Sequence, residues 1–111
     1  MVLKRLKFSE PLPKLILNGK KNSTWRINDD KNILINDLLS LCYSGGREFA
    51  KAKVIFVKET NFENLTEKDK EGHEKFLSDK EMYKAYSNYY NIKVGPKTKV
   101  KIIKFNISNA F

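Results

Sequence analysis

The chain has 111 residues, of which 41% are hydrophobic and 32% charged, and its formal net charge is +9 at pH 7. This length supports one hydrophobic core and excludes two separate domains of ordinary size, so we expect a single domain over residues 1–111. The lone Cys42 excludes an intramolecular disulfide framework and a zinc site built from several cysteines.

The start of the chain predicts a strand followed by a short helix. Residues 2–8 alternate apolar and basic side chains, as a strand with one buried face does. Leu12, Leu15 and Ile16 then recur at helical spacing, which predicts a helix over residues 13–18. Gly19 follows where a left-handed residue often caps a helix, so we expect the helix to end at Asn18 or Gly19.

Extended segments dominate the next part of the chain. Residues 24–27 alternate, which places Thr24 and Arg26 on one side of a strand and Trp25 and Ile27 on the core side. Residues 33–35 and 38–43 are predicted to be extended as well. A turn at residues 44–46 then leads into a long strand over residues 49–57.

Two capping-box sequences, residues 66–69 and 78–81, predict helices in the second half of the chain. The helix that begins after Ser78 carries Met82, Tyr86 and Tyr89 at helical spacing. In residues 97–102, lysines alternate with uncharged residues, so we expect a closing strand whose lysine edge faces solvent.

The order of these elements favours a small α+β protein or a small β-barrel. Several strands are accompanied by only a few short helices, and strands do not alternate with helices as they do in a doubly wound sheet. No internal repeat, linker or low-complexity segment interrupts the sequence. A polar cluster within a cleft of such a fold is then the first place to look for a site.

Residues 19–26 form the most informative stretch, because an amine, a hydroxyl and a guanidinium converge where the first helix ends and the next strand begins. In an extended chain, Lys21 and Thr24 would lie about 10 Å apart. Asn22 and Ser23 are good turn formers, so we expect a turn that brings the amine and the hydroxyl together.

The pattern Gly-x-Lys-x-x-Thr-x-Arg, formed here by Gly19, Lys21, Thr24 and Arg26, resembles the signature of ASCH domains, a branch of the PUA-like superfamily. Other pieces follow in the family's order. They are Asn36-Asp37, the Gly45-Gly46 turn, the segment Leu65-Thr66-Glu67-Lys68-Asp69 with Glu74-Lys75-Phe76 beyond it, and a final strand around residues 101–105. Lys75 stands where the family usually has glycine before an aromatic residue, and the spacing from Leu65 to Glu74 is one residue longer than in many members.

This resemblance implies a PUA-like pseudo-barrel that recognises RNA or a modified nucleoside in a basic cleft. The binding residues would be Lys20, Lys21, Thr24 and Arg26, and no cofactor or metal is expected. The alternative is an amidohydrolase that deacetylates N4-acetylcytidine, as some small bacterial ASCH proteins do, with Lys21, Thr24 and Glu74 as the catalytic trio. Lys21 and Glu74 are equally well explained as an ion pair that ties the signature turn to a later segment.

The excess positive charge is unevenly distributed. Residues 59–81 hold eight of the thirteen acidic residues and four lysines, a local charge of −4, which leaves +13 for the rest of the chain. Such a field attracts RNA through counterion release. Nineteen lysines against three arginines temper this interpretation, because lysine contacts phosphate as a point charge and arginine is better suited to reading bases. A lysine-rich surface without a nucleic-acid partner explains the same composition.

Several aromatic residues allow a stacking role, but packing explains them better. Tyr83, Tyr86, Tyr89 and Tyr90 repeat at helical spacing and are expected to pack a helix onto the core. Trp25 is expected to be a core residue for the same kind of reason. His73 has no second histidine or cysteine at ligand spacing, so we expect a solvated helix position and no metal site.

No stretch of the sequence approaches the ~20 apolar residues of a membrane span. Residues 1–8 do not form the hydrophobic run of a signal peptide. We therefore expect a cytoplasmic monomer that does not bind membranes.

Overall fold

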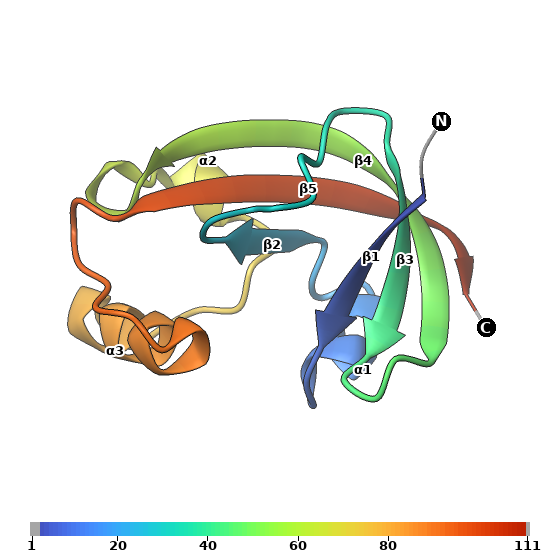
Figure 1. The fold of residues 1–111 in the computed structure, drawn as a ribbon, viewed down its shortest axis with the longest axis horizontal. Helices are drawn as coiled ribbons and strands as arrows, with labels where there is room; N and C mark the ends of the chain where they lie inside the picture. Colours follow the sequence, from blue (N-terminus) through green and yellow to red (C-terminus); the bar gives the residue numbers. More distant parts are fainter. Residues whose placement is uncertain (1–2, 111) are drawn as a thin grey trace.

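The computed structural model describes residues 3–110. Its framework is one five-stranded sheet (Figure 1), in the spatial order β1-β3-β4-β5-β2. Strand β1 pairs in parallel with β3, and every other pair is antiparallel. The strands are β1 (Leu3–Phe8), β2 (Ser23–Arg26), β3 (Leu38–Tyr43), β4 (Glu48–Asn61) and β5 (Lys99–Ala110).

The two longest strands, β4 and β5, form the spine of the sheet and run along the length of the molecule in Figure 1. Their pairing shifts register twice, between Lys51 and Ala52 and between Val54 and Phe56. Such bulges bend a strand and increase its twist, so the sheet curls into a half-barrel instead of staying open. The prediction of a small α+β fold with a curled, barrel-like sheet is therefore confirmed.

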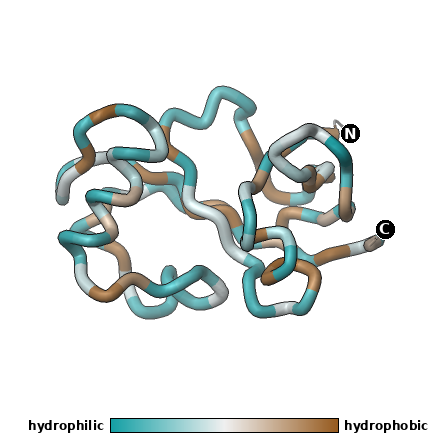
Figure 2. The backbone as a smooth tube through the Cα atoms, turned by 90° about the horizontal axis from the view of Figure 1, so that it is seen from below, coloured by the Kyte–Doolittle hydropathy of each residue, from teal (hydrophilic) through white to brown (hydrophobic). Residues whose placement is uncertain are grey.

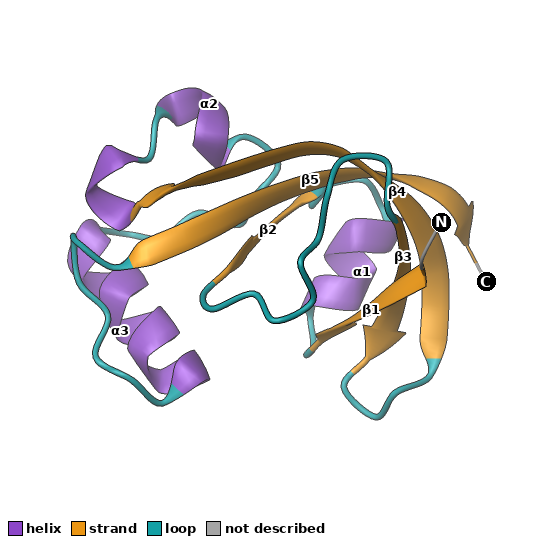
Figure 3. Cartoon of the chain, turned by 45° about the horizontal axis from the view of Figure 1, so that its top comes forward, coloured by secondary structure: helices purple, strands orange, loops and turns teal. Residues whose placement is uncertain are grey.

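The helices occupy two ends of this curl (Figure 3). Helix α1 (Leu12–Leu17) lies beside β1 and β3, and α2 (Glu67–Lys70) and α3 (Asp79–Tyr90) gather at the opposite end, after the short 3-10 helix η1 (Phe62–Asn64). The predicted starts are confirmed, because the side chains of Thr66 and Ser78 accept hydrogen bonds from the backbone N–H groups of Asp69 and Glu81. Gly19 adopts φ +84°, as expected just beyond α1.

Two hydrophobic clusters fill the interior. The first lies between α1 and the β1-β3-β4 half of the sheet, and the second packs α3 against β2 and the start of β5. Strand β5 contributes to both, because Ile103 and Phe105 belong to the first cluster and Val100 and Ile102 to the second. Figure 2 shows the outer loops as largely hydrophilic, in keeping with a mean hydropathy of −0.55.

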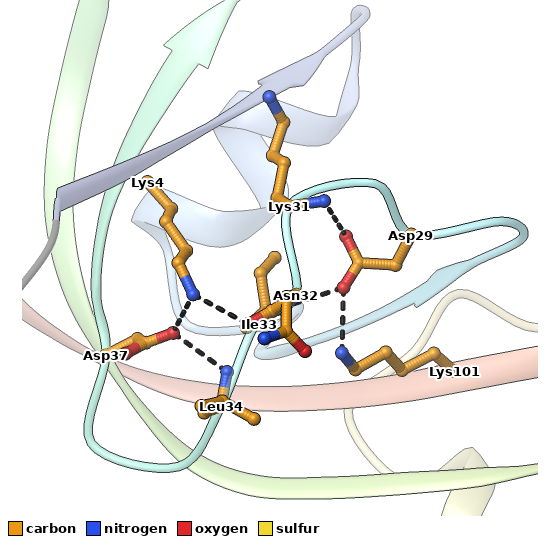
Figure 4. A network of polar contacts seen from close by, with 8 residues as sticks. All are labelled: Lys4, Asp29, Lys31, Asn32, Ile33, Leu34, Asp37 and Lys101. Atoms are coloured by element: carbon orange, nitrogen blue, oxygen red, sulfur yellow. Dashed lines mark hydrogen bonds and ion pairs between the residues drawn. The ribbon is translucent and has the colours of Figure 1, made fainter.

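The loop between β2 and β3 is irregular, so the predicted extended segment at residues 33–35 is wrong. Polar contacts fix this loop instead (Figure 4). The carboxylate of Asp29 accepts hydrogen bonds from the N–H groups of Lys31 and Ile33, and Asp37 accepts one from the N–H of Leu34. Local turn contacts of this kind satisfy the backbone and compete with strand pairing.

Both aspartates also connect the loop to the sheet through ion pairs. The Oδ2 atom of Asp37 lies 2.6 Å from the Nζ atom of Lys4 in β1. The Oδ2 atom of Asp29 lies 2.7 Å from the Nζ atom of Lys101 in β5. Lys97 and Lys99 are exposed, as predicted for a solvent-facing lysine edge, but Lys101 is buried, and for this residue the prediction is wrong. The reason is topological, because β5 lies between β4 and β2 and is not an edge strand. Within residues 3–110, no helix is long and apolar enough to cross a membrane.

Candidate functional site

A cleft of about 270 Å³ opens along the free edge of β2, on the side where this strand has no neighbour. Four parts of the chain line it: the end of β1 with the start of α1, the strand β2 itself, the segment around Glu74, and one side of α3. Because β2 is an edge strand, residues from both of its faces reach the cleft. Lys21, Thr24, Trp25, Arg26 and Glu74 all contribute to the lining.

Lys21 reaches the cleft because the chain turns sharply after α1. The carbonyl oxygen of Leu15 accepts hydrogen bonds from the N–H groups of both Lys20 and Lys21, at 2.9 and 3.0 Å. This closure buries the Lys21 side chain to 2% exposure, and its ammonium donates a 2.6 Å hydrogen bond to the carbonyl oxygen of Ser23. The chain therefore turns at residues 18–20, before the predicted turn at Asn22 and Ser23, because Ser23 already belongs to β2. This earlier turn directs the amine inward.

Glu74 meets Lys21 because its segment docks onto the signature turn. The carbonyl oxygen of Gly72 accepts hydrogen bonds from the N–H groups of Asn22 and Ser23, at 2.9 and 3.2 Å. The Lys21 ammonium then lies 3.0 Å from the Oε2 atom of Glu74 and 3.2 Å from Oε1. The structure thus brings together the three residues of the predicted catalytic trio, with Thr24 lining the same cleft.

His73 lies in a different environment from the one that the sequence predicts. Its side chain is 1% exposed, and it lies in the loop before α3 instead of on a solvated helix position. Its ring stacks on Trp25, with centroids 3.7 Å apart and planes inclined by 12°. Its Nε2 atom lies 2.9 Å from Oε1 of Glu74 and 3.1 Å from the hydroxyl of Tyr86, and Nδ1 lies 2.9 Å from the Glu74 carbonyl oxygen.

These contacts shift the pKa values of Glu74 and Lys21. Burial works to raise the pKa of Glu74, but His73 and Lys21 outweigh it and bring the pKa to about 2. Burial also lowers the pKa of the Lys21 amine, against the opposing effect of Glu74, and nearby Arg26 lowers it further. At neutral pH the glutamate is therefore an anion, and the lysine releases its proton more readily than a lysine in water.

The polar residues of β2 face the cleft in different ways. Thr24 is 5% exposed and lines the cleft. The guanidinium of Arg26 lies 5.2 Å above the ring of Phe8, and its Nη2 atom donates a long 3.4 Å hydrogen bond to the Lys7 carbonyl oxygen. Lys20, by contrast, is exposed on the turn and does not line the cleft, so the structure does not join it to the other predicted binding residues.

The tyrosines of α3 divide their roles. Tyr86 is buried in the second hydrophobic cluster, and Tyr83 packs edge-on against Phe62, as predicted for core contacts. Tyr89 is 58% exposed and lines the cleft together with Tyr90, whose hydroxyl accepts a hydrogen bond from the N–H of Ile27. Trp25 is a core residue as predicted, with 3% exposure, and its indole also forms part of the cleft wall.

The prediction of a basic cleft is not supported by the lining. Its two cationic side chains, Lys21 and Arg26, are balanced by the carboxylates of Glu10 and Glu74. Most of the excess lysines lie elsewhere on the surface of the protein. Composition reports the total charge and not its position, which is why the sequence could not reveal this balance.

Known structures share this architecture. Protein EF3133 from Enterococcus faecalis V583, of family DUF984, is 12% identical with a TM-score of 0.81, over 100% of this chain and 84% of that one. The ASCH domain from Lactobacillus crispatus JV V101 is 15% identical with a TM-score of 0.67, over 96% and 80%. The hypothetical protein PH0355 is 25% identical with a TM-score of 0.73, over 96% and 99%.

No protein-family model matches the sequence, and no curated protein matches it. The likeness therefore lies in three-dimensional structure, and it confirms the ASCH resemblance at the level of the fold.

Proposed function

We propose that this chain, which has the fold of ASCH domains, binds a modified nucleoside in the cleft beside β2, either free or as a single nucleotide of RNA. The observation that carries this proposal is the buried Lys21–Glu74 pair, which lies in a cleft walled by aromatic rings. Aromatic rings stack on unpaired bases, and buried charged groups recognise the polar edge of a base by hydrogen bonds.

The size and charge of the cleft favour a nucleoside over a long polynucleotide within it. A volume of about 270 Å³ is just below the range typical of drug-sized ligands, so it suits one small ligand. The lining carries equal numbers of cationic and anionic side chains, which favours an uncharged base over a phosphate at this position. The surface lysines would then add non-specific affinity for RNA around the cleft.

A second candidate is deacetylation of N4-acetylcytidine, favoured by Thr24, which lines the same cleft as Lys21, a buried amine with a lowered pKa. In this reaction the neutral amine of Lys21 takes the hydroxyl proton as Thr24 Oγ1 attacks the amide carbonyl carbon. The C–N bond then breaks, and the lysine ammonium returns the proton to the departing exocyclic nitrogen of cytidine. Water hydrolyses the acetyl-threonine ester, releases acetate and restores the hydroxyl. Glu74 holds the lysine in place throughout.

Binding can be measured directly, because Trp25 is the single tryptophan and lines the cleft. We expect a saturable change in its fluorescence when N4-acetylcytidine or cytidine is added. Lys21→Met keeps the length of the side chain and removes its charge, so the affinity should fall at least about tenfold, the cost of losing one hydrogen bond to a charged group. Lys53→Met removes the same charge from a residue that does not line the cleft, and serves as the control. A parent protein without a saturable response would refute the proposal.

Turnover is tested separately by incubating the protein with N4-acetylcytidine and separating the product cytidine by chromatography. Thr24→Val keeps the shape of the side chain and removes the hydroxyl, so it should abolish conversion while binding persists. Conversion that survives in Thr24→Val would remove Thr24 as the nucleophile. If the parent protein binds but converts nothing, the binding function stands alone.

A further inference from the structure

A second cavity, of about 210 Å³, adjoins the cleft through a shared residue. Arg26 lines both cavities. The other polar side chains of this second cavity come from the β2–β3 loop, as Asn28 and Asn32, and from the sheet, as Lys99 and Glu59.

The wall of this cavity is already fixed by the contacts drawn in Figure 4. Asp29 accepts hydrogen bonds from two backbone N–H groups of its own loop and lies 2.7 Å from Lys101 of β5. The loop therefore needs no rearrangement before a ligand arrives, and binding does not bear the entropy cost of ordering it. The opposite charges of Asp29 and Lys101 cancel, so this ion pair adds no net charge to the cavity.

The remaining charges favour an anion. Arg26 and Lys99 are cationic, and Glu59, which is exposed, is the one remaining acid in the lining. The guanidinium of Arg26 has unused donors, because its buried Nε atom has no hydrogen-bond partner among the described residues and its Nη2 atom makes only the long contact to Lys7. A planar guanidinium with free donors is the protein group best matched to a phosphate.

We infer that this second cavity is a phosphate subsite, which takes the phosphate of a nucleotide whose base occupies the cleft, with Arg26 and Lys99 as its ligands. The inference rests on the proposed function, because it needs the base to lie on the other side of Arg26. With a phosphate in this subsite, the natural ligand is a nucleotide, free or within RNA, and not an unphosphorylated nucleoside. Asn28 and Asn32 supply amide groups at the rim of the subsite.

The test compares cytidine and N4-acetylcytidine with their 5′- and 3′-monophosphates, by Trp25 fluorescence at fixed ionic strength. We expect at least one monophosphate to bind about tenfold more tightly than its nucleoside, as one hydrogen bond to a charged group warrants. Lys99→Ala should reduce this advantage severalfold and leave the affinity for the free nucleoside unchanged. Glu59→Gln should increase it. Lys53→Ala, which changes the net charge equally and lines neither cavity, should have no such effect.

Each outcome separates this subsite from the proposed function. If the nucleosides bind and neither monophosphate binds more tightly, the subsite is refuted and the cleft is not. The subsite is also refuted if the monophosphate advantage survives unchanged in Lys99→Ala and Lys99→Glu. If neither nucleosides nor monophosphates bind the parent protein, the proposed function fails and the subsite fails with it.

Discussion

A β-carbon placed on Gly72 would lie 1.8 Å from the Oδ1 atom of Asn22, so these two residues, fifty positions apart, approach more closely than any other amino acid at position 72 permits. Gly72 also adopts φ +78°, a conformation that other residues rarely take. This contact brings the segment carrying His73 and Glu74 to Lys21. The geometry of the candidate site therefore depends on a residue that has no functional group.

Gly72→Ala should destabilise the fold by about 1–3 kcal/mol, the usual cost of a strained backbone position, and weaken nucleoside binding. Thermal unfolding and the fluorescence titration measure the two effects. Gly45→Ala is the matched control, because a β-carbon there meets nothing within 4 Å. Asn22→Ala in the Gly72→Ala background should recover part of the loss. An unchanged stability in Gly72→Ala would show that the two segments are not held by this contact.

His73 can be separated into its stacking and its polar contributions. His73→Phe keeps a ring against Trp25 and loses the contacts to Glu74 and Tyr86, whereas His73→Ala loses both. We expect His73→Ala to lower the free energy of unfolding more than His73→Phe, by about 1 kcal/mol for the lost aromatic pair. Both variants should reduce affinity in the cleft, since Glu74 keeps its contact with Lys21 but loses its contact with His73. Denaturant unfolding followed by circular dichroism gives the comparison.

The contacts of Glu74 with His73 and Lys21 predict how the stability of the protein responds to acid. The pKa of Glu74 is about 2 in the folded protein, against an ordinary value of 4.5, so the unfolded chain binds the extra proton first as the pH falls. This contribution to stability is fully present above pH 4.5 and is lost progressively toward pH 2.

Glu74→Gln should therefore unfold with a weaker pH dependence over that window than the parent protein does. At neutral pH it should lose about 3 kcal/mol, the lower end of the range for breaking a buried ion pair, because the Glu74 side chain is 28% exposed. Melting temperatures at several pH values between 2 and 7 provide the measurement. Parallel pH profiles for the two proteins would contradict the pKa assigned to Glu74.

Salt should distinguish the cleft from the surface. Binding of a single-stranded RNA is expected to weaken steeply between about 50 and 200 mM salt. The protein has a net charge of +9, and its basic side chains displace counterions from the RNA phosphates when the RNA binds. Binding of the uncharged nucleoside should change little, because the cleft is electrically balanced. Filter binding for RNA and fluorescence for the nucleoside cover both cases. A nucleoside affinity as salt-sensitive as that of RNA would contradict the balanced cleft.

The sequence identifies the part of the site that is built locally. The spacing of Gly19, Lys21, Thr24 and Arg26 is enough to place an amine and a hydroxyl near each other, because a helix end, a turn and a strand follow directly from it. The position of His73 is not accessible in this way, since its burial depends on the docking of Gly72 onto Asn22 across fifty residues. The adjacent glycine is the one signal that could have suggested a close approach.

Topology explains the other misjudged residues. Lys101 alternates with apolar neighbours as an edge residue would, but pairing on both sides of β5 buries it against Asp29. Residues 33–35 have strand-like composition. The carboxylates of Asp29 and Asp37, however, accept hydrogen bonds from the backbone N–H groups of this segment that strand pairing would need.

Because β5 contributes side chains to both hydrophobic clusters, neither half of the molecule can open without exposing apolar surface that belongs to the other. The half that holds α1 and the half that holds α3 should consequently unfold in one cooperative step. The amide hydrogens of residues 100–105 should then be among the slowest in the chain to exchange with solvent, with rates set by global unfolding. Ligand binding in the cleft would slow that exchange along the whole strand, including Ile103 and Phe105, which pack in the first hydrophobic cluster with α1.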